Sequence, residues 1–213
     1  MGVRMSTCND VLYVESGYPP LGDLIKHRQQ KFFRGMWNDR NNMVDDPLIH
    51  VMKVVFTTRI PTSKYIENLI SGENKSIEEA MSALKLKITQ STSSRRIVYR
   101  SMNPDFYVHD VYTRKTEIPE IHRMSFTRFR VSGHCLAVET GRWNRRGRGR
   151  LPLEERLCPC GDIQTERHVV ESCPMTQDVR AVYSITTLEQ LFLVTNNPSS
   201  LCEAIHNILS IFK

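Results

Sequence analysis

Four residues toward the C-terminal end have the types and the spacing of a metal site. Cys158, Cys160, His168 and Cys173 follow the pattern C-x-C-x7-H-x4-C. Thiolate sulfur and imidazole nitrogen are the ligands that zinc accepts in closed tetrahedral structural sites. Gly161 comes directly after the second cysteine and lets the backbone turn back around an ion. The spacing predicts one structural Zn²⁺ site, whose binding energy would help to fold a short stretch of chain.

The alternative interpretation is a set of unrelated thiols beside an unrelated histidine. It is favoured by the first pair, because C-x-C is tighter than the C-x2-4-C spacing of common zinc knuckles. A catalytic zinc is not expected, since four protein ligands leave no open coordination position. The adjacent pair His134-Cys135 is awkward for joint ligation, so we expect His134 at the surface and Cys135 in packing. Cys8 and Cys202 have no metal-like neighbours.

Arginine is concentrated just ahead of the cysteine cluster. Residues 122–150 hold eight arginines against one acid, while the net charge of the whole chain is +6. Guanidinium groups bind phosphate oxygens in a bidentate manner, and an exposed indole can stack on an unpaired base, although Trp143 could equally well cap the core. We therefore predict an RNA- or DNA-binding segment, with anionic lipid or a merely solvated charged face as the alternatives. The predicted nucleic-acid-binding residues are Arg123, Arg130, Arg142, Trp143, Arg145, Arg146, Arg148 and Arg150.

No pattern in the chain indicates an enzyme. The Walker loop, the G-x-S-x-G elbow and the H-E-x-x-H zinc-protease motif are all missing from the sequence. The pair Asp45-Asp46 resembles the magnesium-binding carboxylates of polymerases. Pro47 follows at once, however, and an N-cap followed by proline at the first helical position explains these residues better.

The elements that position these residues are predicted to be helices. Ser76-Ile77-Glu78-Glu79 is a capping box, and Asn197-Pro198 opens the last helix. Residues 106–112 alternate too weakly to assign. The apolar periodicity and the turn residues predict helices over 21–36, 48–58, 76–88, 94–101, 119–131, 177–183, 188–194 and 201–212.

We therefore predict a mostly α fold, an irregular helical bundle with a small zinc-knuckle-like Cys/His module near the C-terminus. Residues 1–118 would form a helical region and 119–150 a helix followed by the basic segment. Residues 151–176 would form the Cys/His module and 177–213 the C-terminal helices.

Several stretches resemble the C-terminal, zinc-binding region of non-LTR (LINE-type) retrotransposon reverse transcriptases. They are "FTRFRVSGH" from Phe126, "ETGRW" from Glu139 and "LPLEERLCPCGDIQTERHVVESCP" from Leu151. The N-terminal "GVRMSTCNDVLYVESGYPPLGDLIKHRQQKFFRGM" is similar to the thumb or connection segment after the polymerase palm. The resemblance implies the same four zinc ligands and a role in gripping template RNA or target DNA. Polymerase fingers and palm and an endonuclease are not found in this sequence.

These observations lead to one main hypothesis and one alternative. The chain is predicted to be a non-catalytic nucleic-acid-binding fragment derived from a retrotransposon reverse transcriptase. The alternative is a helical protein-interaction or scaffold fragment with no nucleic-acid role. RNA or DNA and other retrotransposon or host proteins are the expected partners, and no membrane is expected, because no apolar run is long enough to span one. With six cysteines and no secretory leader, we expect a reducing location, nuclear or cytoplasmic.

Overall fold

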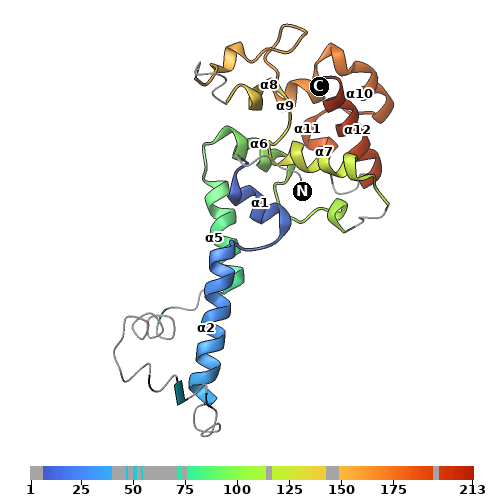
Figure 1. Cartoon of the computed structure of the whole chain (residues 1–213). Helices are drawn as coiled ribbons and strands as arrows, with labels where there is room; N and C mark the ends of the chain where they lie inside the picture. The colour runs from blue at the N-terminus through green and yellow to red at the C-terminus, as the bar shows by residue number, and fades with distance from the viewer. Residues whose placement is uncertain are drawn as a thin grey trace. The chain divides into compact units, whose positions relative to one another are not determined.

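The computed structural model is built from helices (Figure 1). It describes residues 7–39, 47, 50, 51, 54, 72, 76–113, 117–142, 149–193 and 197–213, with the backbone alone at 36–39. Within these residues the only extended pairing is an isolated antiparallel bridge between Leu157 and Ile163. The predicted fold class, mostly helical with a Cys/His cluster toward the C-terminal end, is confirmed.

The chain divides into two compact units. Unit 1 comprises Met1–Gly17 and Lys85–Lys213, and unit 2 comprises Tyr18–Leu84. The predicted segment 1–118 is thus distributed over both units. The next three predicted segments all fall in unit 1.

Unit 2 contains α2 (Leu21–Asp39) and the first half of α5 (Ile77–Thr89). The helix predicted over 21–36 is confirmed by α2. The capping box is formed as predicted, because the Ser76 amide donates to Glu79 Oε2 at 2.8 Å and the Glu79 amide donates to Ser76 Oγ at 3.0 Å. The helix predicted over 48–58 lies largely outside the described residues, as do Asp45 and Asp46.

Unit 1 confirms five more of the predicted helices and adds three short ones for which no range was predicted, α1, α8 and α9. The helices predicted over 94–101, 119–131, 177–183, 188–194 and 201–212 correspond to α6, α7, α10, α11 and α12. The elements of this unit, besides the second half of α5, are α1 (Asn9–Ser16), α6 (Ser94–Met102), η1 (Asp110–Tyr112), α7 (Glu120–Arg130), α8 (Ala137–Thr140), η2 (Leu153–Glu155), α9 (Glu166–Glu171), η3 (Pro174–Thr176), α10 (Gln177–Tyr183), α11 (Leu188–Leu191) and α12 (Pro198–Ser210).

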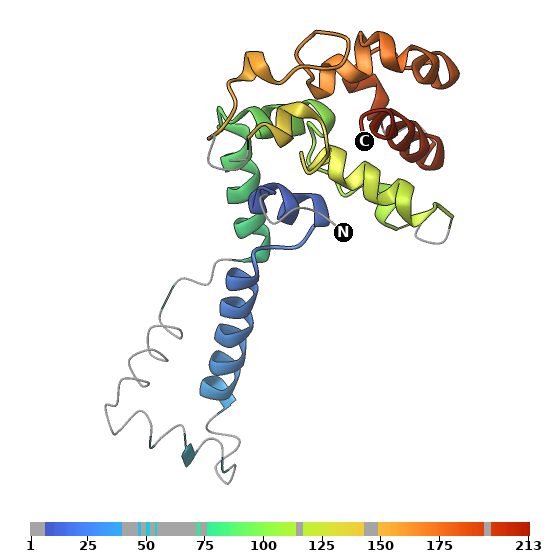
Figure 2. The same cartoon turned by 45° about the horizontal axis from the view of Figure 1, so that its top comes forward.

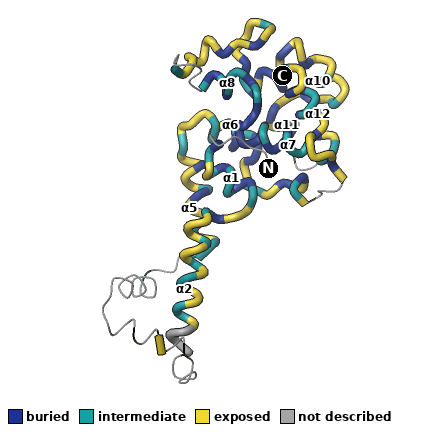
Figure 3. The backbone as a smooth tube through the Cα atoms, in the orientation of Figure 1, coloured by how far each residue is buried: buried dark blue, intermediate teal, exposed yellow. Residues whose placement is uncertain are grey.

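The core of unit 1 forms around α7 and α12, which lie side by side in both views of the ribbon (Figure 2). Phe126 and Phe129 of α7 are completely buried, and so is Ile205 of α12. Figure 3 shows the buried residues gathered where α6, α7, α11 and α12 meet. Val169 and Val170 of α9 belong to the same core. The predicted Cys/His module is therefore packed into the helical body.

A buried ion pair connects α1 to α7. Arg130 and Glu15 have no exposed surface, and the Arg130 Nε lies 2.7 Å from Glu15 Oε1. The hydroxyls of Tyr99 and Tyr112 donate to the same carboxylate at 2.9 and 2.6 Å. Because a charge in the interior is stable only when paired and hydrogen-bonded, these contacts account for the burial of Arg130.

Candidate metal centre and the adjoining arginine groove

A tight turn presents the first two cysteines of the cluster. The Cys158 amide donates to the carbonyl of Asp162 at 2.7 Å, and the Gly161 amide donates to the carbonyl of Cys158 at 2.9 Å. Gly161 has a φ of 102°, a left-handed conformation that glycine adopts without a steric cost. The isolated bridge of the fold flanks this turn on both sides. The turn that Gly161 was expected to allow is therefore formed. This turn, residues 158–162, is called the knuckle below.

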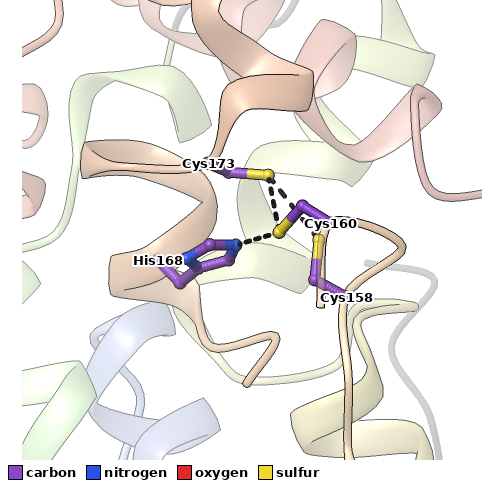
Figure 4. A group of neighbouring side chains, drawn as sticks. All are labelled: Cys158, Cys160, His168 and Cys173. Carbon is purple, nitrogen blue, oxygen red and sulfur yellow. Dashed lines mark hydrogen bonds between the residues drawn. The ribbon is translucent and has the colours of Figure 1, made fainter. Parts of the chain in front are cut away.

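The short helix α9 presents the other two ligands. Thr165 caps this helix, and its side chain accepts a hydrogen bond from the His168 amide at 3.0 Å. Cys173 follows the helix, and its amide donates to the carbonyl of His168 at 2.8 Å. This bond fixes the backbone of Cys173 beside His168, so that both side chains face the knuckle (Figure 4).

The distances among the four ligand atoms match a tetrahedral site. All of them lie within 4.8 Å of one another. Cys158 Sγ is 3.6 Å from Cys173 Sγ, and Cys160 Sγ is 4.0 Å from Cys173 Sγ and 3.2 Å from His168 Nε2. Four ligands around zinc with metal–sulfur bonds of about 2.3 Å place neighbouring sulfurs about 3.8 Å apart. A disulfide needs about 2.05 Å, so the sulfurs are spaced for an ion between them.

The cluster is closed to solvent on most sides. Cys173 is fully buried, and Cys158 and His168 are nearly so. Burial raises the pKa of the Cys158 thiol to about 12, with contributions from the neighbouring thiols. A cation bound among the sulfurs would reverse this, because a coordinating thiol loses its proton. The four residues could therefore hold a metal ion. Four protein ligands would fill its tetrahedral coordination sphere and leave no position open for a substrate.

The second nitrogen of His168 faces away from the sulfurs. Its Nδ1 lies 3.3 Å from the Ser172 hydroxyl and 3.8 Å from a carboxylate oxygen of Asp162. A metal-bound histidine commonly donates its other N–H to such an oxygen, which fixes the ring and its tautomer. These neighbours are placed to keep the Nε2 lone pair directed at the cluster.

A buried histidine ties α9 to the end of α7. His134 Nε2 lies 3.0 Å from Glu166 Oε1, and both residues are buried. Although burial acts to raise the pKa of Glu166, the hydrogen bond and charge of His134 hold it below the ordinary value. The prediction that His134 lies at the surface is wrong, because its ring is buried with Nε2 beside the Glu166 carboxylate. Cys135 packs against the core as predicted, and its Sγ donates to the carbonyl of Leu209 at 3.7 Å.

A groove of about 480 Å³ lies next to α9. It is half open to solvent, and most of its exposed lining is apolar. The lining residues come from α6, α8, α9 and the stretch between α8 and the knuckle. They are Ser94, Arg95, Val98, Val138, Glu139, Arg142, Arg150, Leu151, Pro152, Leu153, Arg156, Thr165, Glu166 and Arg167.

Positive charge is concentrated in this groove. Arg142 donates to Glu139 at 2.8 Å and to the Ser94 hydroxyl at 2.7 Å. Arg156 is held by backbone carbonyls, at 2.6 Å from that of Leu151. Burial lowers the pKa of Arg156, and the positive charges of Arg142 and Arg150 lower it further. The charges of Arg142 and Arg150 therefore repel that of Arg156, and a bound anion would relieve this repulsion.

The structure separates the predicted nucleic-acid-binding residues into different environments. Arg142 and Arg150 line the groove, and Arg123 lies half buried on α7 outside it. Arg130 was predicted wrongly, because its guanidinium is enclosed with Glu15 and has no surface to offer a phosphate. Trp143, Arg145, Arg146 and Arg148 lie outside the described residues.

Sequence reasoning missed the groove and its other arginines, Arg95, Arg156 and Arg167. Its lining comes from separate stretches of the chain, and no spacing rule connects them. The one available signal was the apolar stretch at 151–153 directly after the basic segment.

Comparison of the chain with family models, with curated proteins and with solved structures finds no match. Among the described residues, no helix has the length and the apolar character needed to cross a membrane.

Proposed function

We propose that this chain is a non-catalytic nucleic-acid-binding module stabilised by a structural zinc ion. The observation that carries the proposal is the concentration of like charge at Arg142, Arg150 and Arg156 beside the candidate metal centre. In the sequence, residues 143–148 lie between Arg142 and Arg150 and contain three more arginines and no acidic residue. A polyanion that spans several guanidinium groups relieves their repulsion and releases counterions.

The zinc assignment rests on the chemistry of the ligands. Magnesium and calcium prefer oxygen ligands, whereas three thiolates and one imidazole suit zinc. Zinc holds four such ligands as a fixed tetrahedron and undergoes no redox change. In this module it would fix the knuckle to α9. The bound ion would supply folding free energy, and no reaction is proposed at it.

The metal is tested by measuring the zinc, iron and copper content of the protein after purification without chelator. We expect one zinc per chain, and loss of that zinc in Cys173→Ser. The matched control is Cys135→Ser, which changes a half-buried thiol outside the cluster and should retain the metal. A wild-type protein that contains iron or no metal at all would refute the zinc assignment.

Nucleic-acid binding is tested by its dependence on salt. If about five arginines contact phosphates, log affinity for single strands should fall with log salt with a slope of roughly −3.5. The double variant Arg145→Ala, Arg146→Ala should bind more weakly without losing helicity. As a control, Arg28→Ala removes an exposed arginine of α2 and should leave the slope unchanged. Weak, salt-indifferent binding to RNA, single-stranded DNA and duplex DNA would exclude the proposed function.

We further propose that the chain derives from the C-terminal region of a LINE-type reverse transcriptase. What supports this origin is the shared Cys/His string and the "ETGRW" stretch. The proposed module needs no polymerase centre of its own. A nuclear or cytoplasmic location would keep its thiols reduced and able to bind the metal.

A second candidate function is supported by the surface of α2. Leu21, Ile25 and Phe32 are 61%, 46% and 55% exposed. Their spacing places them along one side of the helix, a pattern typical of helices that pack on a partner. A scaffold role predicts a molar mass that rises with concentration in light scattering, and the rise should disappear in Ile25→Glu. A monomer at all concentrations would argue against self-association through α2.

A further inference from the structure

We propose that the groove beside the metal centre holds one unstacked base of a single-stranded nucleic acid, while the guanidinium groups at its rim contact the flanking phosphates. The inference rests on the proposed function and refines it, because it names the form of nucleic acid that binds. It predicts that the module prefers single strands with bases over duplexes.

The lining of the groove suits a flat, largely apolar group. Val98, Val138, Leu151 and Leu153 contribute aliphatic surface, and the last two are 39% and 48% exposed. The volume of about 480 Å³ falls in the range of pockets that enclose compact ligands. A paired base in a duplex is stacked on both faces and cannot enter such a space, whereas an unpaired base can.

The charges around the groove divide into fixed and available ones. Arg95 and Arg142 both pair with Glu139, and Arg156 is held by the carbonyls of Leu151 and Val138. These groups supply a positive field with little freedom to move. Arg150 is exposed at the rim. It is therefore the side chain best placed to follow a phosphate along a strand.

The count of charges favours an anion in the groove. Five arginines line it against two glutamates, Glu139 and Glu166. Both glutamates are buried, and each already has a partner in the protein. The lining therefore has a formal net charge of +3, from five positive and two negative groups, although one of the five, Arg167, pairs with Glu171 and Glu189 outside the lining. A lining that combines aliphatic side chains with guanidinium groups is complementary to a nucleotide, whose base is apolar on its faces and whose phosphate is anionic.

A lipid also combines an apolar group, its acyl chain, with an anionic headgroup. The sequence around the groove nevertheless favours a single strand of nucleic acid. Arg142 and Arg150 lie at the two ends of a segment with further arginines at positions 145, 146 and 148. A series of cations matches a series of phosphates, whereas one headgroup would occupy few of them. We therefore assign the groove to a single strand.

The test compares two probes with equal charge and unequal base content. One is a fluorescent oligothymidylate of about 12 nucleotides, within the site sizes of single-strand binders. The other has the same length and phosphates but abasic sugars. We expect the zinc-loaded chain to bind the abasic probe roughly tenfold more weakly by fluorescence anisotropy, because the favourable contacts of a base with side chains are lost.

Two variants connect this difference to the groove. Leu153→Ala, at a side chain 48% exposed, should weaken binding of the thymidylate several-fold and leave binding of the abasic probe unchanged. Leu193→Ala is the matched control, since Leu193 is 52% exposed and lies outside the groove. It should change the affinity for neither probe.

The other outcomes separate the inference from the function on which it rests. Equal affinity for both probes, or tighter binding of a duplex of the same length, would overturn the base-binding groove and leave a general polyanion binder. No binding of either probe, of RNA or of duplex DNA would overturn the proposed function itself. Tighter binding of phosphatidylserine vesicles than of the thymidylate, with loss of vesicle binding in Leu153→Ala, would reassign the groove to lipid.

Discussion

Arg130 and Arg150 belong to the same arginine-rich stretch, residues 122–150, and have opposite environments. Arg130 has no exposed surface, and the rings of Tyr99, Tyr107, Phe126 and Phe192 surround its guanidinium at 5.4 to 6.0 Å. Its carboxylate partner, Glu15, is 115 residues away in the sequence. Arg150 is exposed at the groove. A partner distant in the sequence, and not the local density of charge, therefore decides whether an arginine is buried in an ion pair or remains available to bind a ligand.

The two regions also differ in what their charges contribute. Removal of one partner of a buried pair leaves an uncompensated charge in the interior, so Arg130 and Glu15 are needed together. The groove arginines are stable without a ligand, because carbonyls and Glu139 partly satisfy them. Changes at the first region should therefore act on folding, and changes at the second on binding.

The largest effect is expected from removal of the metal, because α9 takes part in both regions. Val169 and Val170 pack in the core, while Thr165 and Arg167 line the groove. Structural zinc contributes about 10–16 kcal/mol to the folding of isolated zinc-finger peptides, so several kcal/mol of unfolding free energy should be lost here. Thermal denaturation with and without a chelator, followed by circular dichroism, measures the loss.

Nucleic-acid binding should disappear along with stability when the metal is removed. Cys173→Ser should melt at the temperature of the chelated wild type, and addition of chelator should not lower it further. Cys135→Ser should respond to chelator as the wild type does. An apo protein that melts like the zinc-loaded one would show that the packing of α9 does not depend on the cluster.

The next effect in size concerns the buried pair. Glu15→Gln removes the charge that compensates Arg130, and we expect the free energy of unfolding to fall by about 3–5 kcal/mol. The affinity of the folded fraction for nucleic acid should not change. Urea denaturation provides the first measurement, and anisotropy below the urea transition provides the second.

A second carboxylate of the same region is the control for the buried pair. Asp10 pairs with Lys87 and with Arg96, and its side chain is 18% exposed. Asp10→Asn should cost about 1 kcal/mol, as expected for pairs that solvent reaches. If both variants cost the same, enclosure would not be the factor that distinguishes Arg130.

Local sequence signals were sufficient for most of the described helices and for grouping the four candidate metal ligands. The capping box at Ser76 and the Asn197-Pro198 start are each set by a few adjacent residues, so they could be predicted. The four metal ligands lie within 16 consecutive positions, 158 to 173, and their spacing alone indicated one centre.

Contacts between distant residues could not be predicted in the same way. His134 appeared exposed until the fold placed Glu166 beside it, and Arg130 appeared free until α1 placed Glu15 beside it. α1 itself is short and ends at Gly17, which has a φ of 72°. Its amphipathic pattern is weak, and its buried residues are covered by the rest of unit 1. The sequence of the helix alone therefore does not indicate its burial. The groove depends on tertiary packing to the same extent.

A smaller effect is expected at the rim of the groove. Arg150→Ala should reduce the magnitude of the salt slope by about 0.7, the value for one phosphate contact on a single strand. Unfolding should be little affected, because Arg150 is exposed and, within the described part of the chain, no hydrogen bond of its side chain is found. Arg142→Ala should reduce the slope similarly and also lower stability, since the buried Glu139 then keeps only Arg95. Equal stability of the two variants would mean that the Arg142 pair contributes nothing to folding.

The smallest effect is a pH dependence that originates in the buried region. The His109 ring is 3% exposed, lies 4.8 Å from the Phe126 ring, and accepts a hydrogen bond from the Val111 amide at its Nδ1. Burial, together with the charge of Arg130, lowers the pKa of His109 to about 4 against the opposing charges of Glu15 and Asp110. The folded state therefore keeps this ring neutral.

The sign of the pH effect follows from proton binding. The unfolded chain takes up a proton on His109 near its ordinary pKa of 6.5, whereas the folded chain does so only near 4. The contribution to stability is complete above pH 6.5 and decreases as the pH falls from 6.5 to 4. Urea denaturation between pH 7 and 5 avoids the protonation of most carboxylates. His109→Gln should flatten the decrease, and His50→Gln, at an exposed position, should not. An unchanged decrease in His109→Gln would place its origin in other groups, either His206, whose pKa burial also lowers, or the proposed metal ligands, whose protonation also weakens folding.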